Sequence, residues 1–331
     1  MSAIDKLGLA KDLARKVLNG GETTREEALE LYDAPLDELS VAANEIRERF
    51  CKRDFDLCSI VNAKSGRCSE DCKFCAQSAR YATKCDEHPI LPVETLVAAA
   101  KKDAEKGVLR FSFVTSGRRL NASEIDVLCE AARKIRDEVG IALCGSLGLL
   151  TEEEYSRLRA AGVTRIHNNL ETSRRFFPYI CTTHTYDQKL DALRAARRAG
   201  MTLCSGGIFG LGETPEDRID MALTLRELEV KSVPINILNA IPGTPLANAD
   251  LRPLTSADAR RIVAVYRFLL PDASLRLAGG RGLLSDSGFG CFLSGANATI
   301  TGDMLTTSGI AIASDLRVIK DMGYEPKLCH D

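Results

Sequence analysis

The sequence predicts a parallel (β/α)8 barrel preceded by a helical extension, and three observations lead to this prediction. From about residue 57 onward, short apolar segments alternate with longer segments whose apolar residues recur at helical spacing. Eight short segments are found, the number that closes such a barrel. The chain of 331 residues also has a length that α/β barrels commonly reach as one unit. Because periodicity alone cannot show closure, an open doubly wound sheet is the alternative.

The first part of the chain has a purely helical pattern. Thr24 and Glu27 have the spacing of a capping box, and Leu36, Leu39 and Ile46 follow at helical spacing. Helices are therefore expected within residues 4–50. We expect two parts, a helical extension over residues 1–50 and a barrel domain over residues 51–331.

Strands and helices are expected to alternate through the barrel. Strands are predicted near residues 57–63, 109–115, 140–146, 163–169, 201–208, 231–238, 273–279 and 291–299. Helices are predicted near residues 93–107, 123–138, 151–162, 186–200, 215–229, 255–270 and 312–322. Thr151 and Thr214 stand at expected helix starts, and Gly162 and Gly200 stand at expected helix ends. In either architecture the functional site is expected at the carboxyl ends of the strands.

Composition and charge exclude several classes of protein. The chain is 45% hydrophobic and 27% charged, and its 44 basic and 46 acidic residues give a net charge of -2. This balance gives no electrostatic case for nucleic-acid binding. No apolar run is long enough to span a membrane, and the N-terminus lacks the basic-then-apolar pattern of a secretion signal. We therefore expect a cytoplasmic protein whose 12 cysteines serve metals, catalysis or core packing rather than disulfides.

The most informative motif is Cys68-Ser-Glu-Asp-Cys72-Lys-Phe-Cys75, which has C-x3-C-x2-C spacing and directly follows the first predicted strand. Thiolates are soft ligands suited to iron–sulfur clusters or zinc. A closed zinc site needs a fourth ligand, and this loop offers none at the usual spacing. Three thiolates on a four-iron cluster leave one iron open, as S-adenosylmethionine requires for radical chemistry. The alternative is a set of buried thiols or a loose metal clip.

Polar or glycine-rich segments end several later predicted strands. They are His167-Asn-Asn169-Leu-Glu171, the stretch from Cys204 to Glu213, Pro234-Ile-Asn236, Arg276-Leu-Ala-Gly-Gly-Arg281 and, near the end of the chain, Leu305-Thr306-Thr307. The glycines at 206–212 lack the spacing of a dinucleotide fingerprint. We expect them to let the backbone approach a flat ligand such as an adenosine group. No hydrolytic triad is evident, and no catalytic residue is assigned.

Together with Asn62-Ala-Lys-Ser-Gly-Arg-Cys68 and Cys75-Ala-Gln-Ser78, these segments closely resemble the biotin synthases of the radical S-adenosylmethionine superfamily, from about residue 57 to residue 323. That family converts dethiobiotin to biotin by inserting sulfur between two unactivated carbons. The resemblance implies a sulfurtransferase in which a 5′-deoxyadenosyl radical, made from S-adenosylmethionine, breaks each C–H bond. Such carbons have no acidic proton, so the site must hold radical and substrate in contact and exclude water.

The resemblance implies roles in binding the first cluster and its cofactor. Cys68, Cys72 and Cys75 would hold a 4Fe-4S cluster. Phe74 would lie against the adenine, and Glu171 would bond the ribose hydroxyls. Lys189 replaces an arginine that approaches the cofactor carboxylate in the family, and it keeps the charge without the bidentate fork.

The resemblance also implies substrate contacts. Asn169 and Asn236 match amides that bond the ureido ring of dethiobiotin, which suits a group that both donates and accepts hydrogen bonds. Thr306 and Thr307 match a pair that receives the substrate carboxylate. For each of these residues a structural role at a strand end or in a loop is the alternative.

The family carries an auxiliary iron–sulfur cluster that is thought to supply the sulfur. Its best-known members bind a 2Fe-2S cluster through three cysteines and one arginine, and Cys144, Cys204 and Arg276 match three of these positions. Ser112 occupies the remaining cysteine position, and a hydroxyl is a poor replacement for a thiolate at iron. An altered auxiliary cluster is therefore expected, unless the cluster is lost or the serine binds iron.

Two further cysteines are candidates for this altered cluster. Cys58 lies on the first predicted strand, where an inward-facing side chain would point into the barrel, and Cys181 lies in Tyr179-Ile-Cys181-Thr-Thr-His184. Core packing is the alternative for both cysteines. Neither His167 nor His184 sits in a metal-ligand pattern, so both are interpreted as packed or exposed histidines.

The sequence also leads to expectations about partners and leaves two competing functions open. The resemblance implies an electron donor such as flavodoxin or ferredoxin, iron–sulfur assembly proteins and a homodimer. One competing function is a sister radical enzyme, similar to a hydrogenase-cofactor maturase or a methylornithine synthase. Asn169, Asn236 and the threonine pair favour a ureido acid substrate over these sisters. The other competing function is a non-catalytic iron–sulfur or zinc-binding protein.

Overall fold

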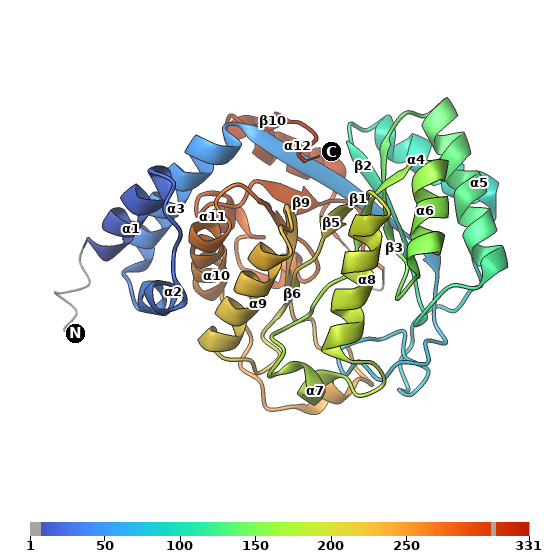
Figure 1. The fold of residues 1–331 in the computed structure, drawn as a ribbon, viewed down its shortest axis with the longest axis horizontal. Coiled ribbons are helices and arrows are strands. Elements are labelled where there is room, and N and C mark those ends of the chain that lie inside the picture. Colours follow the sequence, from blue (N-terminus) through green and yellow to red (C-terminus); the bar gives the residue numbers. More distant parts are fainter. Residues whose placement is uncertain (1–7, 306–308, 331) are drawn as a thin grey trace.

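The computed structural model describes residues 8–305 and 309–330, in which parallel strands close into a barrel (Figure 1). The strands are β1 (Asp54–Lys64), β2 (Arg110–Thr115), β3 (Ala142–Ser146), β4 (Val163–His167), β5 (Thr202–Cys204), β6 (Gly207–Phe209), β7 (Ser232–Ile237), β8 (Ser274–Leu277) and β9 (Ala298–Ile300). The ring closes because β9 pairs with β1, with Ala298 opposite Asp56. The predicted eight-strand barrel is confirmed, and the open sheet is excluded.

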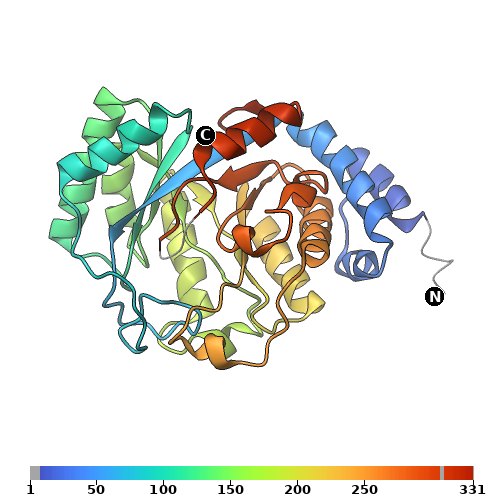
Figure 2. The ribbon, with the colours of Figure 1, turned by 180° about the vertical axis from the view of Figure 1, so that it is seen from behind.

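Helices surround this barrel, as Figures 1 and 2 show from opposite sides. They are α4 (Val93–Ala104), α5 (Ala122–Glu138), α6 (Glu152–Ala161), α7 (Phe177–Ile180), α8 (Tyr186–Arg198), α9 (Pro215–Glu227), α10 (Ser256–Leu269), α11 (Phe289–Phe292) and α12 (Ile312–Asp321), with short 3-10 turns at Pro245–Asn248 and Arg281–Leu283 and a short strand β10 (Glu325–Pro326) beside β1. Thr151 and Thr214 each cap a helix as predicted. No helix of the described ranges is long and apolar enough to cross a membrane.

Three helices precede the barrel, namely α1 (Leu9–Leu18), α2 (Arg25–Tyr32) and α3 (Leu36–Cys51). The predicted capping box is present, because the Thr24 hydroxyl accepts from Glu27 N at 3.2 Å and the Glu27 carboxylate accepts from Thr24 N at 2.8 Å. Arg261 of α10 donates to the carbonyls of Tyr32 and Ala34 at 2.8 and 2.7 Å. These bonds hold the helical extension against the outside of the barrel.

Two predicted strands differ from the observed ones. The segment predicted at 201–208 is interrupted between β5 and β6, which both pair with β7 and together form one stave of the barrel. The last strand begins at Ala298 rather than near residue 291, because the apolar stretch before it starts with the helix α11. Gly288 and Gly295, with φ of 80° and 106°, allow the turns on either side of that helix.

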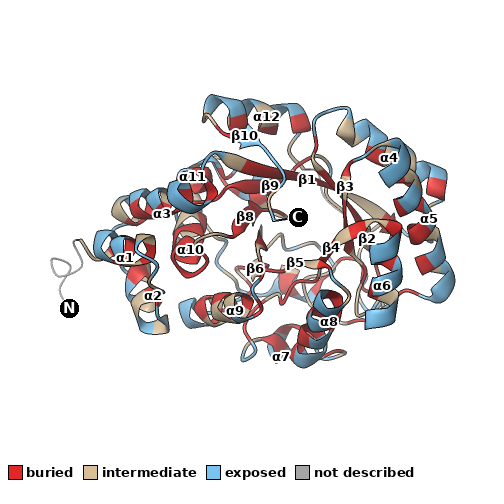
Figure 3. Ribbon diagram, turned by 45° about the horizontal axis from the view of Figure 1, so that its top comes forward, coloured by how far each residue is buried: buried red, intermediate tan, exposed pale blue. Residues whose placement is uncertain are grey.

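Alternation along each strand decides which side chains enter the barrel. On β2, Arg110 and Ser112 face the interior cavity, whereas Phe111 and Phe113 are buried on the other face. The same period of two brings Arg165 and His167 of β4 to the cavity. Figure 3 shows the resulting ring of buried strands with the C-terminal end of the chain at its centre. The barrel interior therefore carries polar and thiol side chains.

We predict that Gly206 tolerates no side chain. A Cβ atom there would lie 2.0 Å from the Pro234 carbonyl oxygen of the neighbouring strand, so Gly206→Ala must push two strands apart. Overpacking of this kind costs about 1–3 kcal/mol or more. A lower urea midpoint of unfolding is the expected result. Gly282→Ala is the matched control, because a Cβ atom at Gly282 meets no atom within 4 Å. Equal midpoints for the two variants would contradict this explanation.

Candidate functional site

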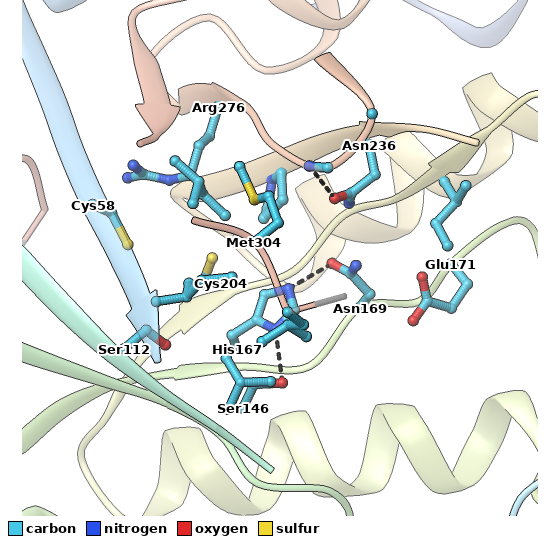
Figure 4. A pocket seen from close by; sticks show the side chains of 18 of the residues that line it. Cys58, Ser112, Ser146, His167, Asn169, Glu171, Cys204, Asn236, Arg276 and Met304 are labelled. Carbon is cyan, nitrogen blue, oxygen red and sulfur yellow. Dashed lines mark hydrogen bonds between the residues drawn. The ribbon is translucent and has the colours of Figure 1, made fainter. Parts of the chain in front are cut away.

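A cavity of about 300 Å³ occupies the barrel interior and is lined by the inward-facing strand residues and the loops at the carboxyl end (Figure 4). Cys58, Cys144 and Cys204 line it from three strands. Phe74 and Cys75, from the loop after β1, line it as well. The three strand cysteines and Cys75 of the cysteine loop therefore share one cavity, whose volume is large enough for a small organic substrate.

A buried ion network forms one end of the cavity, which Arg165 and Arg276 line. The fully buried Asp56 carboxylate lies 2.8 Å from Arg276 and 3.2 Å from Arg165. Burial raises the pKa of Asp56, but Arg276, Arg165 and Arg110 outweigh it and hold that pKa below its usual value. Arg165 also donates to the carbonyl of Cys329 at 2.6 Å. The charged floor thus joins β1, β4 and β8 to the C-terminal segment.

A group of three buried cysteines lines the cavity. Cys58 is on β1, Cys144 on β3 and Cys204 on β5, and the hydroxyl of Ser232 donates to Cys204 Sγ at 3.3 Å. Burial raises the pKa of Cys58 and of Cys204 to about 11, so these groups are neutral thiols until a metal displaces their protons. Figure 4 shows Cys58 and Cys204 on facing parts of the wall with Ser112 beside them.

This donor set fits an iron–sulfur group by its chemistry, because soft thiols from separate strands face one enclosed space. Arg276 lines the same cavity. The structure therefore brings together four of the five residues predicted for the auxiliary site. Cys181 is not among the residues that line the cavity. Its Sγ atom lies 3.8 Å from Cys72 Sγ, in the region of the cysteine loop.

His167 and Asn169 belong to a chain of hydrogen-bonded side chains along one wall of the cavity (Figure 4). His167 Nδ1 lies 3.1 Å from Ser146 Oγ, and His167 Nε2 lies 3.0 Å from Asn169 Oδ1. Gly206 N also donates to Asn169 Oδ1 at 3.0 Å, which identifies that atom as the amide oxygen. The NH2 group of Asn169 is therefore the end that can donate to a ligand.

Glu171 follows β4 in an unusual backbone conformation, with φ of 70°. Burial raises the pKa of Glu171, and Lys189 opposes that rise with its Nζ 4.0 Å from the carboxylate. Glu171 Oε2 is buried without a hydrogen-bond partner among the described residues. A buried carboxylate oxygen in this state fits a ligand that brings hydroxyl donors. Lys189 also donates to Asn168 Oδ1 at 3.1 Å and does not line the cavity.

Asn236 is tied into the backbone at the ends of two strands. Its Nδ2 donates to the Gly207 carbonyl at 3.0 Å, and its Oδ1 accepts from Gly279 N at 2.9 Å. Asn236 lines the cavity, so the residue combines a structural role with a position where a substrate can meet it. Thr306 and Thr307 lie outside the described residues. The neighbouring Met304 and Leu305 line the cavity.

Two residues of the glycine run at 206–212 are required by contacts within the protein. At Gly206 and Gly207 a Cβ atom would meet the carbonyl oxygens of Pro234 and Glu171, at 2.0 and 2.5 Å. Close packing of the protein's own strands therefore requires these two glycines, and the expected approach of a flat ligand to the run stays a prediction. Glu171 O accepts from Ile208 N at 2.9 Å, which shows how closely the two segments lie.

The cysteine loop is a compact turn held by backbone bonds. Cys68 N donates to Gln77 O at 3.0 Å, and Cys75 N donates to Cys72 O at 2.9 Å. The three thiols of Cys68, Cys72 and Cys75 are partly exposed, in contrast to the buried thiols inside the barrel. Three soft donors on one short loop fit a cluster that keeps an open iron for a ligand.

Several residues of the site region were not predicted from the sequence. Arg110 and Arg165 stand two residues before Ser112 and His167, so strand alternation was the signal that could have placed them in the interior. His184 was interpreted as a packed or exposed residue. The structure shows that it is packed, and places its ring 3.3 Å from Cys181 Sγ and 2.7 Å from Glu70. No local motif predicts the contact between His184 and Glu70, because Glu70 lies far away in sequence.

Comparison with known proteins agrees with this arrangement. The family model described as "Radical SAM superfamily" matches residues 63–225, and the one described as "Biotin and Thiamin Synthesis associated domain" matches residues 234–325. A biotin synthase from Brachyspira hyodysenteriae is 56% identical over 320 residues, which cover 97% of this chain and 96% of that protein. Biotin synthase 2 from Corynebacterium diphtheriae is 56% identical over 326 residues, which cover 98% of each.

Solved structures support the fold at low sequence identity. Methylornithine synthase superimposes with a TM-score of 0.80 at 18% identity, over 96% of this chain and 97% of that one. The FeFe-hydrogenase maturase from Carboxydothermus hydrogenoformans gives a TM-score of 0.80 at 18% identity, over 97% of this chain and 80% of that one. These likenesses concern the barrel architecture, whereas the full-length relatives at 56% identity identify the family.

We predict that acid destabilises the fold partly through His167. Burial lowers the pKa of His167 to about 4 from its ordinary 6.5, so between these values the unfolded chain binds a proton that the folded chain does not. The contribution of His167 to stability is therefore fully present above its ordinary pKa of 6.5. It is lost progressively as the pH decreases toward about 4, the pKa of His167 in the folded protein. The loss should reach about 2 kcal/mol near pH 5.

The measurement is urea unfolding at neutral pH and near pH 5, for the wild type and for His167→Asn. The decrease in unfolding free energy between the two pH values should be smaller in His167→Asn by about the stated amount. An equal decrease in the two proteins would show that another group causes the acid sensitivity.

Proposed function

This chain belongs to the biotin synthase family of the radical S-adenosylmethionine superfamily, and we propose that it converts dethiobiotin to biotin by radical-mediated insertion of sulfur. The observation that carries the proposal is the shared cavity. A loop with three thiols borders it, and a second set of three thiols lines it within the barrel. A substrate held in this cavity would meet the radical source and a sulfur source at once.

The first cluster would be held by Cys68, Cys72 and Cys75. When bound and reduced by an external electron donor, this cluster would supply the one electron that cleaves S-adenosylmethionine to methionine and a 5′-deoxyadenosyl radical, which can remove hydrogen from saturated carbon. Phe74 would pack against the adenine, and the unpartnered oxygen of Glu171 would accept the ribose hydroxyls. Lys189 would act by setting the charge of Glu171, to which it lies close, rather than only by meeting the cofactor carboxylate.

The substrate would lie between the polar wall and the cysteine loop. The NH2 group of Asn169 is oriented by His167 and Gly206 and would donate to the ureido carbonyl of dethiobiotin. Asn236 would meet the same ring from the neighbouring strand end, because Asn169 and Asn236 bond to the adjacent residues Gly206 and Gly207. By family resemblance, Thr306 and Thr307 would receive the carboxylate. The apolar side chains of Ile60, Val114, Ile208 and Ile300 on the cavity wall would exclude water from the reacting carbons.

The auxiliary cluster would be held by Cys58, Cys144 and Cys204, with Arg276 close to it. When bound, this cluster supplies the sulfur that is inserted. Ser112 stands among these groups and is a weak ligand for iron, so Cys58 provides the third thiolate. The changed ligand positions imply a cluster other than the standard 2Fe-2S type. Cys181 is left out of this set because it contacts Cys72 instead.

Partners and context follow from the same assignment. Reductive cleavage of S-adenosylmethionine requires an electron donor, and flavodoxin or ferredoxin would fit this role. We further infer that iron–sulfur assembly proteins load the clusters and that the enzyme is a cytoplasmic homodimer. Residues 1–50 would form the helical extension, and residues 51–331 would form the catalytic barrel.

We predict biotin formation from dethiobiotin, S-adenosylmethionine and a strong reductant under anaerobic conditions. Cys72→Ala should abolish both biotin and 5′-deoxyadenosine, because it removes a thiolate from the first cluster. Both products are measured by mass spectrometry. Formation of 5′-deoxyadenosine without biotin, in protein with both clusters intact, would favour a different radical reaction. Absence of both products in the loaded wild type would favour a non-catalytic metal protein.

We predict that Cys58→Ala loses the auxiliary cluster and keeps the first one. Mössbauer spectra with iron and sulfide counts should show one remaining cluster, and biotin formation should fall to background while S-adenosylmethionine cleavage continues. Cys129→Ala is the matched control, because Cys129 is a buried cysteine on α5 that does not line the cavity. Retention of both clusters in Cys58→Ala would refute the altered ligand set.

A further inference from the structure

Cys72, Cys181 and His184 bring two thiols and an imidazole together outside the barrel cavity. Their ligand atoms all lie within 4.8 Å of one another. Cys181 and His184 are both buried, and they come from the segment between α7 and α8. Cys72 comes from the cysteine loop more than a hundred residues earlier. The tertiary fold, and not a local motif, therefore assembles this group.

The spacing of the group matches tetrahedral coordination. Two thiolates on one tetrahedral zinc ion, each about 2.3 Å from it, are separated by about 3.8 Å, and a thiolate and an imidazole nitrogen by about 3.5 Å. Cys72 Sγ and Cys181 Sγ are 3.8 Å apart, and Cys181 Sγ and His184 Nε2 are also 3.8 Å apart. These two distances lie within a few tenths of an ångström of the ideal values, and the ligand atoms of Cys72 and His184 lie within 4.8 Å of each other.

A carboxylate orients the histidine for this role. Glu70 Oε2 lies 2.7 Å from His184 Nδ1, and both side chains are 7% exposed, so solvent competes little with this bond. A histidine that donates from one ring nitrogen to a carboxylate presents the other nitrogen to a metal. Nδ1 is thus engaged with Glu70, and Nε2 is the ligand atom.

Backbone contacts hold the two segments in register. Lys73 N donates to Ile180 O at 2.9 Å, next to Cys72 and Cys181. The Asp71 carboxylate accepts from Thr182 N at 2.8 Å, and Asp71 N donates to Thr183 Oγ1 at 3.1 Å. These bonds flank the group on both segments, so little ordering is needed when an ion binds.

We propose that Cys72, Cys181 and His184 form a binding site for one divalent zinc-class ion when the first iron–sulfur cluster is absent. Cys72 belongs to both sites, so the ion and the cluster exclude each other, and zinc bound here delays cluster assembly. Glu70 is a positioning residue for His184. The site does not depend on the reaction that the loaded enzyme catalyses, so it can fail while the proposed function stands.

The first test isolates the site in full-length, cluster-free protein. In a Cys68→Ser/Cys75→Ser background, which cannot hold the first cluster, Co²⁺ is titrated anaerobically as a spectroscopic probe and then displaced with Zn²⁺. We expect tetrahedral cobalt bands with thiolate charge transfer, and loss of one equivalent of cobalt when Cys181→Ser is added. Cys85→Ser is the control and should leave the spectrum unchanged. Equal cobalt stoichiometry with and without Cys181 would overturn the proposal.

The second test uses the otherwise unaltered chain, so it does not depend on the stability of a triple variant. Glu70→Gln should weaken Zn²⁺ binding about 10–100-fold, as loss of a carboxylate behind a histidine ligand does. One equivalent of Zn²⁺ should slow cluster reconstitution from ferrous iron and sulfide in the wild type, but not in Cys181→Ser. The same zinc inhibition in both proteins would overturn the proposal.

Discussion

The buried ion network around Asp56 is the constraint on which the rest of the site depends. Its carboxylate joins Arg276 of β8 and Arg165 of β4 to β1, so it connects well-separated parts of the barrel wall. Breaking a buried pair of this kind costs about 3–5 kcal/mol, because an uncompensated charge stays behind. Arg165 also holds the carbonyls of Cys329 and His330. These contacts hold the strands and the C-terminal segment together at one end of the barrel. The barrel is therefore a chamber that opens at the carboxyl end of its strands.

The cysteines inside this chamber and those on the cysteine loop have different environments. Cys58 and Cys204 lie inside the chamber, where burial raises their pKa values to about 11. Cys68 and Cys75 are partly exposed on the loop beside the chamber, where a cofactor can reach a cluster from solution. The proposed reaction needs a radical source and a sulfur source, and it fits this division, because the two sets of cysteines have different surroundings and Cys75, Cys58, Cys144 and Cys204 line one cavity.

Cys72 links the cysteine loop to a second polar region, formed with Cys181, His184 and Glu70. Loops that carry metal ligands are commonly oriented by neighbouring polar groups, and those neighbours influence which metal is bound. The contacts of Asp71 with the segment after α7 place Cys181 next to Cys72 even without a metal. The fold, as well as the three-cysteine motif, therefore decides which polar side chains surround Cys72.

The sequence alone predicted alternating strands and helices and the place of the cysteine loop after the first strand, because strand alternation and motif spacing are local patterns. Closure of the barrel and the position of Cys58 at the cavity were decided by the tertiary structure, which pairs β9 with β1. The sequence also led to the chemistry of the family, since the strand-end segments are specific. Tertiary structure decided where Cys181 and His184 lie, why Gly206 must be glycine, and how Arg165 pairs with Asp56. Each of these depends on contacts between residues distant in the chain, and no local period or spacing records such contacts.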